Sequence, residues 1–141
     1  MNTIFDTEDG NVIIPEGTVN IESINFNYRQ FKSVVIPDSV TKIENRAFAR
    51  CSLLESVAIP ESVNTISVGA FENCKSLKSI NIPNSVTEIS NGTFKDCRSL
   101  ESITIPDSVT KIGLAAFAAC TSLESITIPK SVTEFGKSPN D

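Results

Sequence analysis

The sequence contains no histidine and no tryptophan, and it has one methionine and one tyrosine among 141 residues. Without histidine, the chain lacks the side chain that most often transfers protons near neutral pH. The 12 basic residues are outnumbered by 17 acidic ones, which gives a net charge of −5. Since nucleic-acid binding depends on a basic surface that neutralises phosphates, we expect no nucleic-acid partner. The composition favours a binding or structural module.

Long hydrophobic runs are also missing. No stretch approaches the roughly 18 consecutive apolar residues of a membrane-spanning helix, so we expect no membrane insertion. Residues 1–9 have neither a basic start nor an apolar core, so they do not form a signal peptide. The compartment stays open, because a leader could have been removed. With 40% apolar and 21% charged residues, residues 1–141 are expected to form a single domain.

A 23-residue repeat dominates the sequence. Proline, phenylalanine and cysteine recur with this period and keep the same phase, and earlier copies stand at Pro15 and Phe26. The three series are Pro37, Pro60, Pro83, Pro106 and Pro129; Phe48, Phe71, Phe94 and Phe117; and Cys51, Cys74, Cys97 and Cys120. Self-similarity at a period of about 20 to 50 residues indicates a solenoid or another repeat array.

Each unit contains the pattern of a strand that ends at proline. Residues 103–105 alternate apolar and polar side chains, which predicts a strand with one face buried. Proline then ends the strand because it has no N–H to donate. Residues 109–112 suggest a second extended run on the opposite side of the coil, and residues 113–120 are expected to form a short helix or 3₁₀ turn.

The units must stack to be stable. The apolar side chains of one unit stabilise it by about 10–20 kcal/mol, whereas ordering its backbone and side chains costs about 35 kcal/mol. Neighbouring copies therefore have to complete the core. We expect residues 1–14 to form an N-terminal cap and first rung, 15–128 five repeats, and 129–141 a truncated last repeat. A hairpin joining residues 4–5 to 12–14 would cover the first rung.

The repeat resembles the BspA-like leucine-rich repeat family. The resemblance is carried by Ala47-Phe48, Cys51 and Ile59-Pro60 and recurs over about residues 12–135. It implies a right-handed leucine-rich-repeat coil of about six rungs, an α/β solenoid that is rich in strand and has short helical turns. It also implies cell-surface attachment and protein–protein contact. The first unit departs from the pattern with Arg29 at the cysteine position, as suits a capping repeat.

The four cysteines are expected to form a buried, reduced ladder. Like residues of successive rungs stack in a line, so the end cysteines would lie about 14 Å apart. Zinc requires thiolates that converge about 2.3 Å from one point, and the sequence has no CxxC pair. Oxidised neighbouring pairs remain the alternative. Since the chain has no histidine to activate a thiol, a nucleophilic cysteine is not expected.

The carboxylates are scattered over variable positions, and none of their possible pairings stands out. We interpret them as solvated surface charge, although a paired-carboxylate site stays open. Residues 6–10 faintly resemble a calcium loop, but a hairpin turn explains them better. We therefore predict no catalytic residues, no metal, no cofactor and no enzyme activity.

The strand face is the predicted binding surface. With Ile103 and Ile105 inward, Ser102 and Thr104 face outward, and the equivalent residues of other rungs form columns. The predicted interaction face consists of Lys32, Ser33, Glu55, Ser56, Lys78, Ser79, Asn81, Glu101, Ser102, Thr104, Glu124, Ser125 and Thr127. It lacks the aromatic residues and arginines of typical hot spots, so the serines could instead simply keep a sheet soluble.

The last repeat stops before its own Ala-Phe-x-x-Cys segment. Apolar side chains there lack a succeeding rung, which predicts self-association through Ile126, Ile128, Val132 and Phe135, or a longer array. Two hypotheses emerge. The chain is a protein-interaction or adhesion module with a protein partner, or a structural spacer that associates end to end, forming a homodimer.

Overall fold

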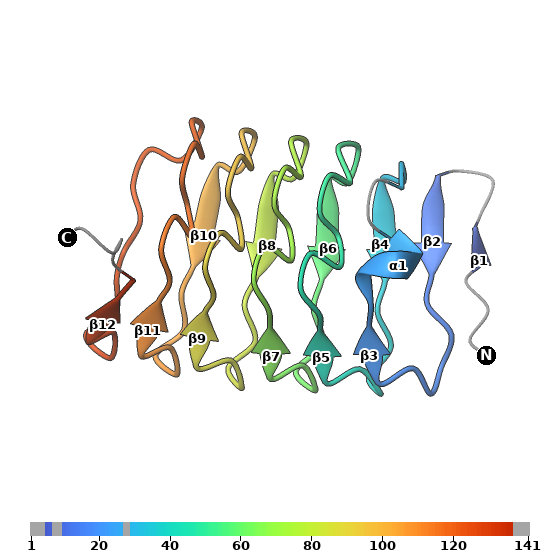
Figure 1. The fold of residues 1–141 in the computed structure, drawn as a ribbon, viewed down its shortest axis with the longest axis horizontal. Helices are drawn as coiled ribbons and strands as arrows, with labels where there is room; N and C mark the ends of the chain where they lie inside the picture. The colour runs from blue at the N-terminus through green and yellow to red at the C-terminus, as the bar shows by residue number, and fades with distance from the viewer. Residues whose placement is uncertain (1–4, 7–9, 27–28, 137–141) are drawn as a thin grey trace.

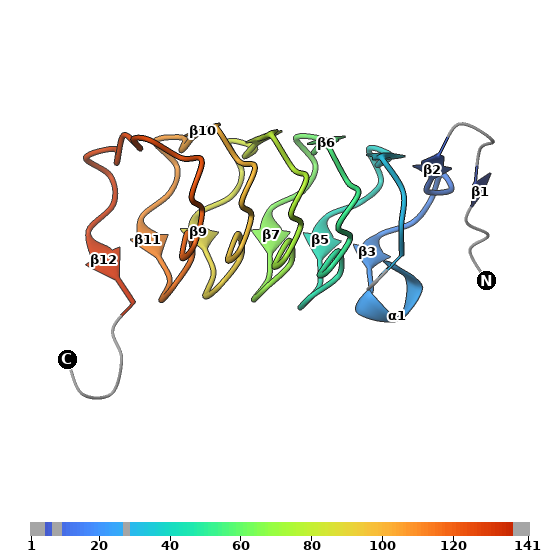
Figure 2. The ribbon, with the colours of Figure 1, turned by 90° about the horizontal axis from the view of Figure 1, so that it is seen from above.

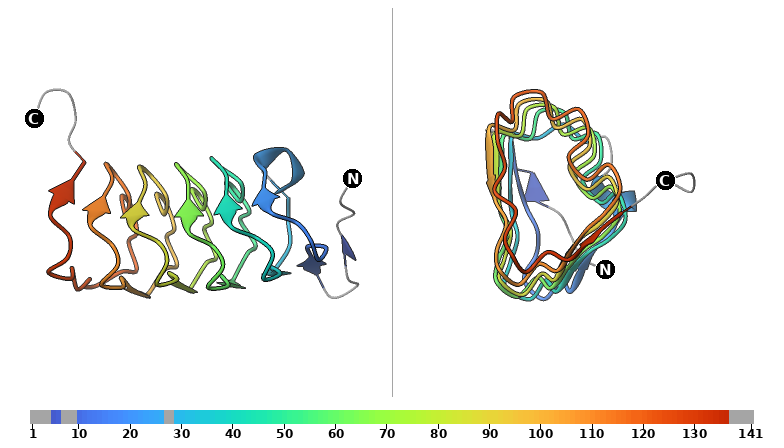
Figure 3. Two further views of the ribbon diagram at one scale, coloured as in Figure 1. Left: turned by 90° about the horizontal axis from the view of Figure 1, so that it is seen from below. Right: turned by 90° about the vertical axis from the view of Figure 1, so that its left-hand side faces the viewer.

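The computed structural model describes residues 5–6, 10–26 and 29–136. They form an elongated parallel β-solenoid, whose successive rungs are stacked along the long axis (Figures 1 and 2). Viewed along that axis, the rungs superimpose into one closed outline (Figure 3). The predicted solenoid is confirmed. Within these ranges, no helix is long and apolar enough to cross a membrane.

The larger sheet follows one side of the solenoid. Its strand order within the described chain is β1 (Phe5–Asp6), β2 (Asn11–Ile13), β4 (Ser33–Val35), β6 (Ser56–Ala58), β8 (Ser79–Asn81) and β10 (Ser102–Thr104). From β2 onward the strands are parallel, and each rung lies in register with the next. These strands are the period-two segments that precede the repeated prolines, as the sequence predicts.

Shorter strands line a second side. They form two small sheets, one of β3 (Asn20–Ile21), β5 (Lys42–Ile43) and β7 (Thr65–Ile66), and one of β9 (Glu88–Ile89), β11 (Lys111–Ile112) and β12 (Glu134–Phe135). All neighbouring pairs are parallel. The second extended run of each unit is thereby confirmed, although each strand is only two residues long.

Aromatic rings stack along the core. Phe48, Phe71 and Phe94 are almost completely buried. Their ring centroids lie 5.3 Å and 5.8 Å apart, and Phe117 continues the stack 5.6 Å beyond Phe94. At the other end, Phe26 packs against Phe48 at 5.2 Å. The 23-residue period of phenylalanine therefore places one ring per rung directly above the last.

The turns that carry these rings do not form the short helix that is one expectation for residues 113–120. Their internal hydrogen bonds join residue i to residue i−3, as from Ala118 to Ala115 and from Cys120 to Phe117, which is the spacing of the 3₁₀ turn, the other expectation. Within the described chain, the one helix is α1 (Ser23–Phe26) in the first rung. In a later turn, the N–H of Phe48 donates to the carbonyl of Ala70 in the next rung at 2.8 Å, whereas the N–H of Ala49 donates within its own turn to Arg46. This alternation connects neighbouring rungs, which an α-helix could not do, because its amides bond within the helix.

Two positions of each turn adopt the left-handed conformation. One holds Arg46, Gly69, Gly92 and Ala115, with φ between 54° and 64°. The second holds Arg50, Asn73, Asp96 and Ala119, with φ between 60° and 62°. A residue with positive φ interrupts a right-handed helix, so these turns cannot continue as regular helices. Glycine, asparagine and aspartate tolerate this conformation better than other residues.

A hairpin covers the N-terminal end of the sheet. β1 pairs antiparallel with β2, with Phe5 opposite Ile13 and Asp6 opposite Val12. The predicted hairpin is confirmed for these residues. Residue 4 and residues 7–9, which include most of the segment that resembles a calcium loop, lie outside the described residues.

Candidate interaction surface

The outward positions of the larger sheet form aligned columns, because its strands are in register. Ser79 pairs with Ser56 on one side and with Ser102 on the other, and all three are exposed. Ser33 continues the column but is half-buried, and its hydroxyl is hydrogen-bonded to the side chain of Asn11. The structure therefore brings the serines of four successive rungs together on one surface.

A shallow hollow of about 410 Å³ lies on this surface, over strands β6, β8 and β10. The three outermost serines of the column, Ser56, Ser79 and Ser102, contribute to its wall. Ala58, Asn81 and Thr104 contribute from the next outward column. Hydroxyl, amide and methyl groups are thus all presented, but no charged side chain lines the hollow.

Asn81 differs from the other members of the predicted face. Its side-chain amide donates to the carbonyl of Ile59 at 2.9 Å, and its Oδ1 accepts the N–H of Ile59 at 3.1 Å. These two hydrogen bonds take the place of backbone–backbone hydrogen bonds between the two rungs, so Asn81 has a structural role. The ladder between β6 and β8 accordingly pairs Ser56 with Ser79 and Val57 with Ile80, and no further.

Charged residues flank the hollow along one edge. The predicted column Lys32, Glu55, Lys78, Glu101 and Glu124 is exposed throughout. Backbone hydrogen bonds from Glu55 to Lys32, from Lys78 to Glu55 and from Glu101 to Lys78 hold its first four members in register, at 2.8 Å, 3.1 Å and 3.1 Å. The sign of the charge changes along this edge, and its last two residues are both acidic.

The predicted face does not extend to the last repeat. The larger sheet ends at β10, and neither Ser125 nor Thr127 belongs to a strand, although both are exposed. These two residues therefore do not pair with β10 as the repeat predicts, although Thr127 lines one hollow together with Thr104. Equal sequence spacing does not guarantee pairing here.

The residues predicted to self-associate lie at the C-terminal end. Phe135 is on β12, opposite Ile112 of β11, and 56% of its surface is exposed. Ile128 is 38% exposed, whereas Ile126 and Val132 are partly buried against the core. Phe135 and Ile128 are the more exposed of these four apolar side chains.

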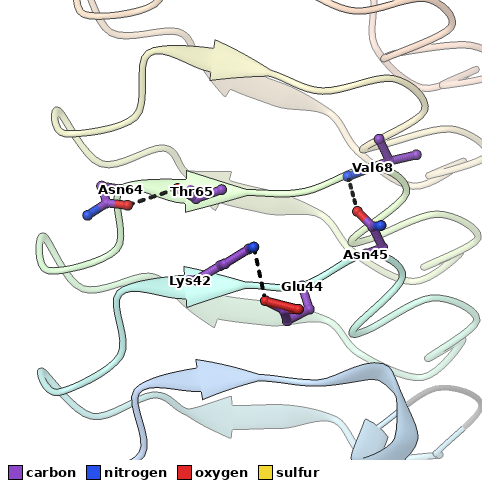
Figure 4. A network of polar contacts seen from close by, with 6 residues as sticks. All are labelled: Lys42, Glu44, Asn45, Asn64, Thr65 and Val68. Atoms are coloured by element: carbon purple, nitrogen blue, oxygen red, sulfur yellow. Dashed lines mark hydrogen bonds and ion pairs between the residues drawn. The ribbon is translucent and has the colours of Figure 1, made fainter.

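The side of the smaller sheets is occupied with its own polar contacts (Figure 4). Asn45 accepts the N–H of Val68 in the next rung at 3.2 Å, and Lys42 forms an ion pair with Glu44 at 3.2 Å. These side chains already bind within the solenoid.

The cysteines form a ladder of free thiols beside the phenylalanines. Each Sγ donates to the carbonyl of a phenylalanine in the preceding rung, at 3.1–3.2 Å. Cys51, Cys74 and Cys97 are buried, and Cys120 is half-buried. The structure thus agrees with a reduced ladder and gives each sulfur a hydrogen-bond acceptor.

Burial makes these thiols poor nucleophiles. It raises the pKa of Cys51 to about 12, although the backbone and charge of Arg29 act in the opposite direction. It also raises the pKa of Cys74, Cys97 and Cys120. The thiolate is the reactive form, so the raised pKa values keep all four sulfurs mainly protonated near neutral pH.

The carboxylates that come after the repeated prolines do not converge. Asp38, Glu61 and Asp107 are all exposed, and Glu61 accepts the N–H of Asn84 in the next rung at 3.1 Å. Over the part of the chain that the structure describes, no three metal-ligating side chains come close enough to hold an ion.

Sequence reasoning missed a hollow of about 340 Å³ lined by Gln30, Arg50, Ser52, Asn73 and Lys75. It also missed two hollows beside β10, at the C-terminal end of the larger sheet. The residues of the first hollow do keep the repeat spacing, with Arg50 and Asn73 at the second left-handed turn position and Ser52 and Lys75 two residues later. Spacing alone does not show that these side chains surround a hollow.

Comparison with known proteins agrees with this architecture. A family model described as BspA type leucine rich repeat region matches six copies over residues 11–139. The chain belongs to this family. In a search of curated proteins, no protein matches this chain significantly.

Solved structures of bacterial leucine-rich repeat proteins are similar to this BspA-type chain. A T. pallidum leucine-rich repeat protein is 30% identical with a TM-score of 0.73, and one from Bacteroides ovatus is 35% identical with a TM-score of 0.68. A leucine rich cell surface protein from Faecalibacterium prausnitzii is 28% identical with a TM-score of 0.63. Each comparison covers 96% of this chain, but only 61%, 36% and 48% of the respective relatives.

Proposed function

We propose that this BspA-type chain is a non-catalytic module that binds a protein partner through the outer face of strands β4 to β10. The observation that carries the proposal is the 410 Å³ hollow, in which outward side chains of three in-register rungs meet. The absence of histidine from the sequence and the raised pKa of the four thiols support a non-catalytic role.

Recognition through this face depends on repetition. It lacks the tryptophan, tyrosine and arginine anchors that supply most of the energy at protein interfaces. Several weak, equivalent contacts from successive rungs then have to act together. One structural relative is described as a cell surface protein, which supports the part of our proposal that puts the module at a cell surface. Adhesion there is the role we propose for it.

The test compares two sides of the same solenoid. A partner is first identified by cross-linking wild-type protein to a cell-surface extract, and its affinity is measured by surface plasmon resonance. We expect Ser79→Arg with Ser102→Arg to weaken binding at least tenfold. The matched control, Thr65→Arg with Glu88→Arg, changes exposed residues of the smaller sheets and is expected to retain binding.

Charge reversal provides a second test. Lys78→Glu and Glu101→Lys change the flanking edge and are expected to alter the association rate while leaving the melting temperature unchanged. Face and control variants that bind equally well would contradict the proposed interaction face.

The exposed apolar groups of the last rung favour a second function, a spacer that associates end to end. Sedimentation velocity is expected to show a concentration-dependent dimer that Ile128→Asp or Phe135→Asp abolishes. Ile24→Asp, at a residue of the first rung that is 86% exposed, is the matched control and is expected to leave the dimer intact. A wild-type chain that stays monomeric at every concentration would contradict this alternative.

A further inference from the structure

The last rung leaves one edge of β10 open. Glu55, Lys78 and Glu101 each donate a backbone N–H to the equivalent residue of the preceding rung. Glu124 does not donate to Glu101, and residues 125–127 do not pair with β10, although both segments lie in the described part of the chain. The polar backbone groups on this side of β10 therefore have no neighbouring strand.

The open edge does not result from a changed repeat. Residues 125–128 have the sequence Ser-Ile-Thr-Ile, identical to residues 102–105. This rung also contacts the preceding rung both before and after residues 124–128. Before them, the hydroxyl of Ser122 donates to the carbonyl of Arg98 at 2.6 Å, and after them, β12 pairs with β11. We call the space between the backbone of β10 and residues 124–128 the slot.

Two hollows mark the ends of this slot. One of about 500 Å³ is lined by Glu101, Thr121, Ser122 and Glu124. The other, of about 320 Å³, is lined by Ile103, Thr104, Ile105, Asp107, Thr127 and Pro129. Ile103 is correspondingly only half-buried, whereas its counterpart Ile80 on β8 is 7% exposed.

The lining is acidic at both ends. Glu101 and Glu124 stand where β10 begins and Asp107 where it ends, and all three are exposed. No lysine or arginine is among the residues that line the two hollows. An extended peptide with a basic residue at each end would place its charges beside these carboxylates while its backbone bonds to β10.

We propose that the slot binds an extended, basic peptide segment of a partner protein by strand addition to β10. Strand addition obtains affinity from backbone hydrogen bonds and selectivity from alternate side chains. The apolar wall at Ile103 and Ile105 accepts β-branched side chains, and the carboxylates select the flanking charges. The slot shares Ile103 and Thr104 with the hollow of the outer face and Glu101 and Glu124 with its flanking edge, whereas Ser56 and Ser79 line the face hollow alone. Variants at these two serines test the face without changing the slot, so either proposal can fail without the other.

The probe is a fluorescein-labelled peptide of sequence KVTVTK, measured by fluorescence anisotropy at low salt. We expect saturable binding, and at least tenfold weaker binding of EVTVTE and of KVPVTK, since proline removes a backbone donor. The double variant Glu101→Gln/Glu124→Gln is expected to weaken KVTVTK binding several-fold. Glu22→Gln/Glu88→Gln, which neutralises two exposed carboxylates elsewhere, is the matched control and is expected to bind like the wild type.

A disulfide lock tests the location. Ser102→Cys/Ser125→Cys places thiols at positions that would face each other if the rung closed, as Ser79 and Ser102 do in the formed ladder. Parallel neighbours are close enough for a disulfide. Oxidation is expected to abolish KVTVTK binding, and reduction to restore it. Binding that survives the lock would overturn the proposal.

Two other occupants have different signatures. If the chain's own residues 124–128 fill the slot, their amides exchange with deuterium as slowly as those of residues 101–105, and KVTVTK does not bind. If a second copy fills it, the wild type forms a dimer that the oxidised lock abolishes. Either result would also overturn the proposal.

Discussion

Replacement of a central phenylalanine tests whether the rungs support one another. Phe71 is completely buried, and its ring lies between those of Phe48 and Phe94, at 5.3 Å and 5.8 Å. Phe117 occupies the same repeat position but is half-buried, and its one ring neighbour among the described residues is Phe94 at 5.6 Å. The two positions have the same chemistry and differ in how well neighbouring rungs cover them.

The expected magnitude depends on this difference. Truncation of a fully buried phenylalanine to alanine costs about 3–5 kcal/mol, as lost transfer energy plus the cavity left behind. Against a total stability of about 5–15 kcal/mol, Phe71→Ala should remove a large fraction. Phe117→Ala removes less buried surface and one described ring contact, so we expect about half that loss.

Urea unfolding monitored by far-ultraviolet circular dichroism measures both losses. With a slope of about 2 kcal/mol per molar urea, Phe71→Ala should lower the midpoint by about 1.5–2.5 M. Phe71→Leu, which retains most of the buried volume, keeps the comparison possible if the alanine variant does not fold. Equal losses at Phe71 and Phe117 would refute the reasoning, because they would show that the centre and the C-terminal end of the stack are covered equally.

Three further outcomes are expected. Gly92→Ala should lower the free energy of unfolding by about 1 kcal/mol and Ala115→Gly should raise it by about 0.5–1 kcal/mol, because both residues have positive φ, of 62° and 58°. Urea midpoints of the two variants measure these changes, and shifts of the same sign would contradict the prediction. Cys120 should react with a charged thiol reagent before the three buried cysteines, as mass spectrometry of the modified protein would show; uniform rates in the folded state would contradict the ladder. Stability should fall above about pH 9. The unfolded chain then releases the Cys51 proton, whereas burial retains this proton in the folded state up to a pKa of about 12. For this thiol the free energy of unfolding falls by about 1.4 kcal/mol per pH unit, and Cys51→Ala should show a shallower fall between pH 9 and pH 11.

The sequence predicts the solenoid well because its strongest signals are also its structural contacts. Proline follows each strand of the larger sheet from β2 onward, phenylalanine stacks on phenylalanine, and each cysteine bonds to the preceding rung. The alternation of Ser102, Ile103 and Thr104 likewise identifies which side chains are exposed. Each of these features depends on one rung and its immediate neighbour, which a single period of sequence contains.

The turns were harder to predict because composition and geometry disagree. Residues 114–119 have the sequence Leu-Ala-Ala-Phe-Ala-Ala, which is typical of a helix. Ala115 and Ala119 nevertheless adopt positive φ, as Gly92 and Asp96 do one rung earlier. Comparing the same column across rungs would have revealed this, because glycine, asparagine and aspartate at equivalent positions indicate a left-handed backbone that the alanines share.

The site could be predicted only in part, because the pairing of a strand depends on the conformation of the next rung. Nothing in residues 125–128 distinguishes them from residues 102–105, yet β10 forms and its successor does not. Asn81 shows the same limit, since its place in an outward column gives no sign that it binds the backbone of Ile59. In both cases the outcome is decided by contacts between rungs and not by the residue types within one.

The two proposed surfaces depend on opposite properties of the same repeat. The outer face requires that successive rungs be alike, since its hollow is formed by equivalent residues of β6, β8 and β10. The slot requires that one rung differ. Its wall is the strand edge that, in the preceding strands of the sheet, pairs with the next strand. A partner of the face would therefore be recognised by side chains at several rungs, and a partner of the slot by backbone at one. Substitutions at Ser56 and Ser79, which line the hollow of the face but neither hollow of the slot, should therefore leave the slot intact, whereas closing the slot would lengthen the face by one rung.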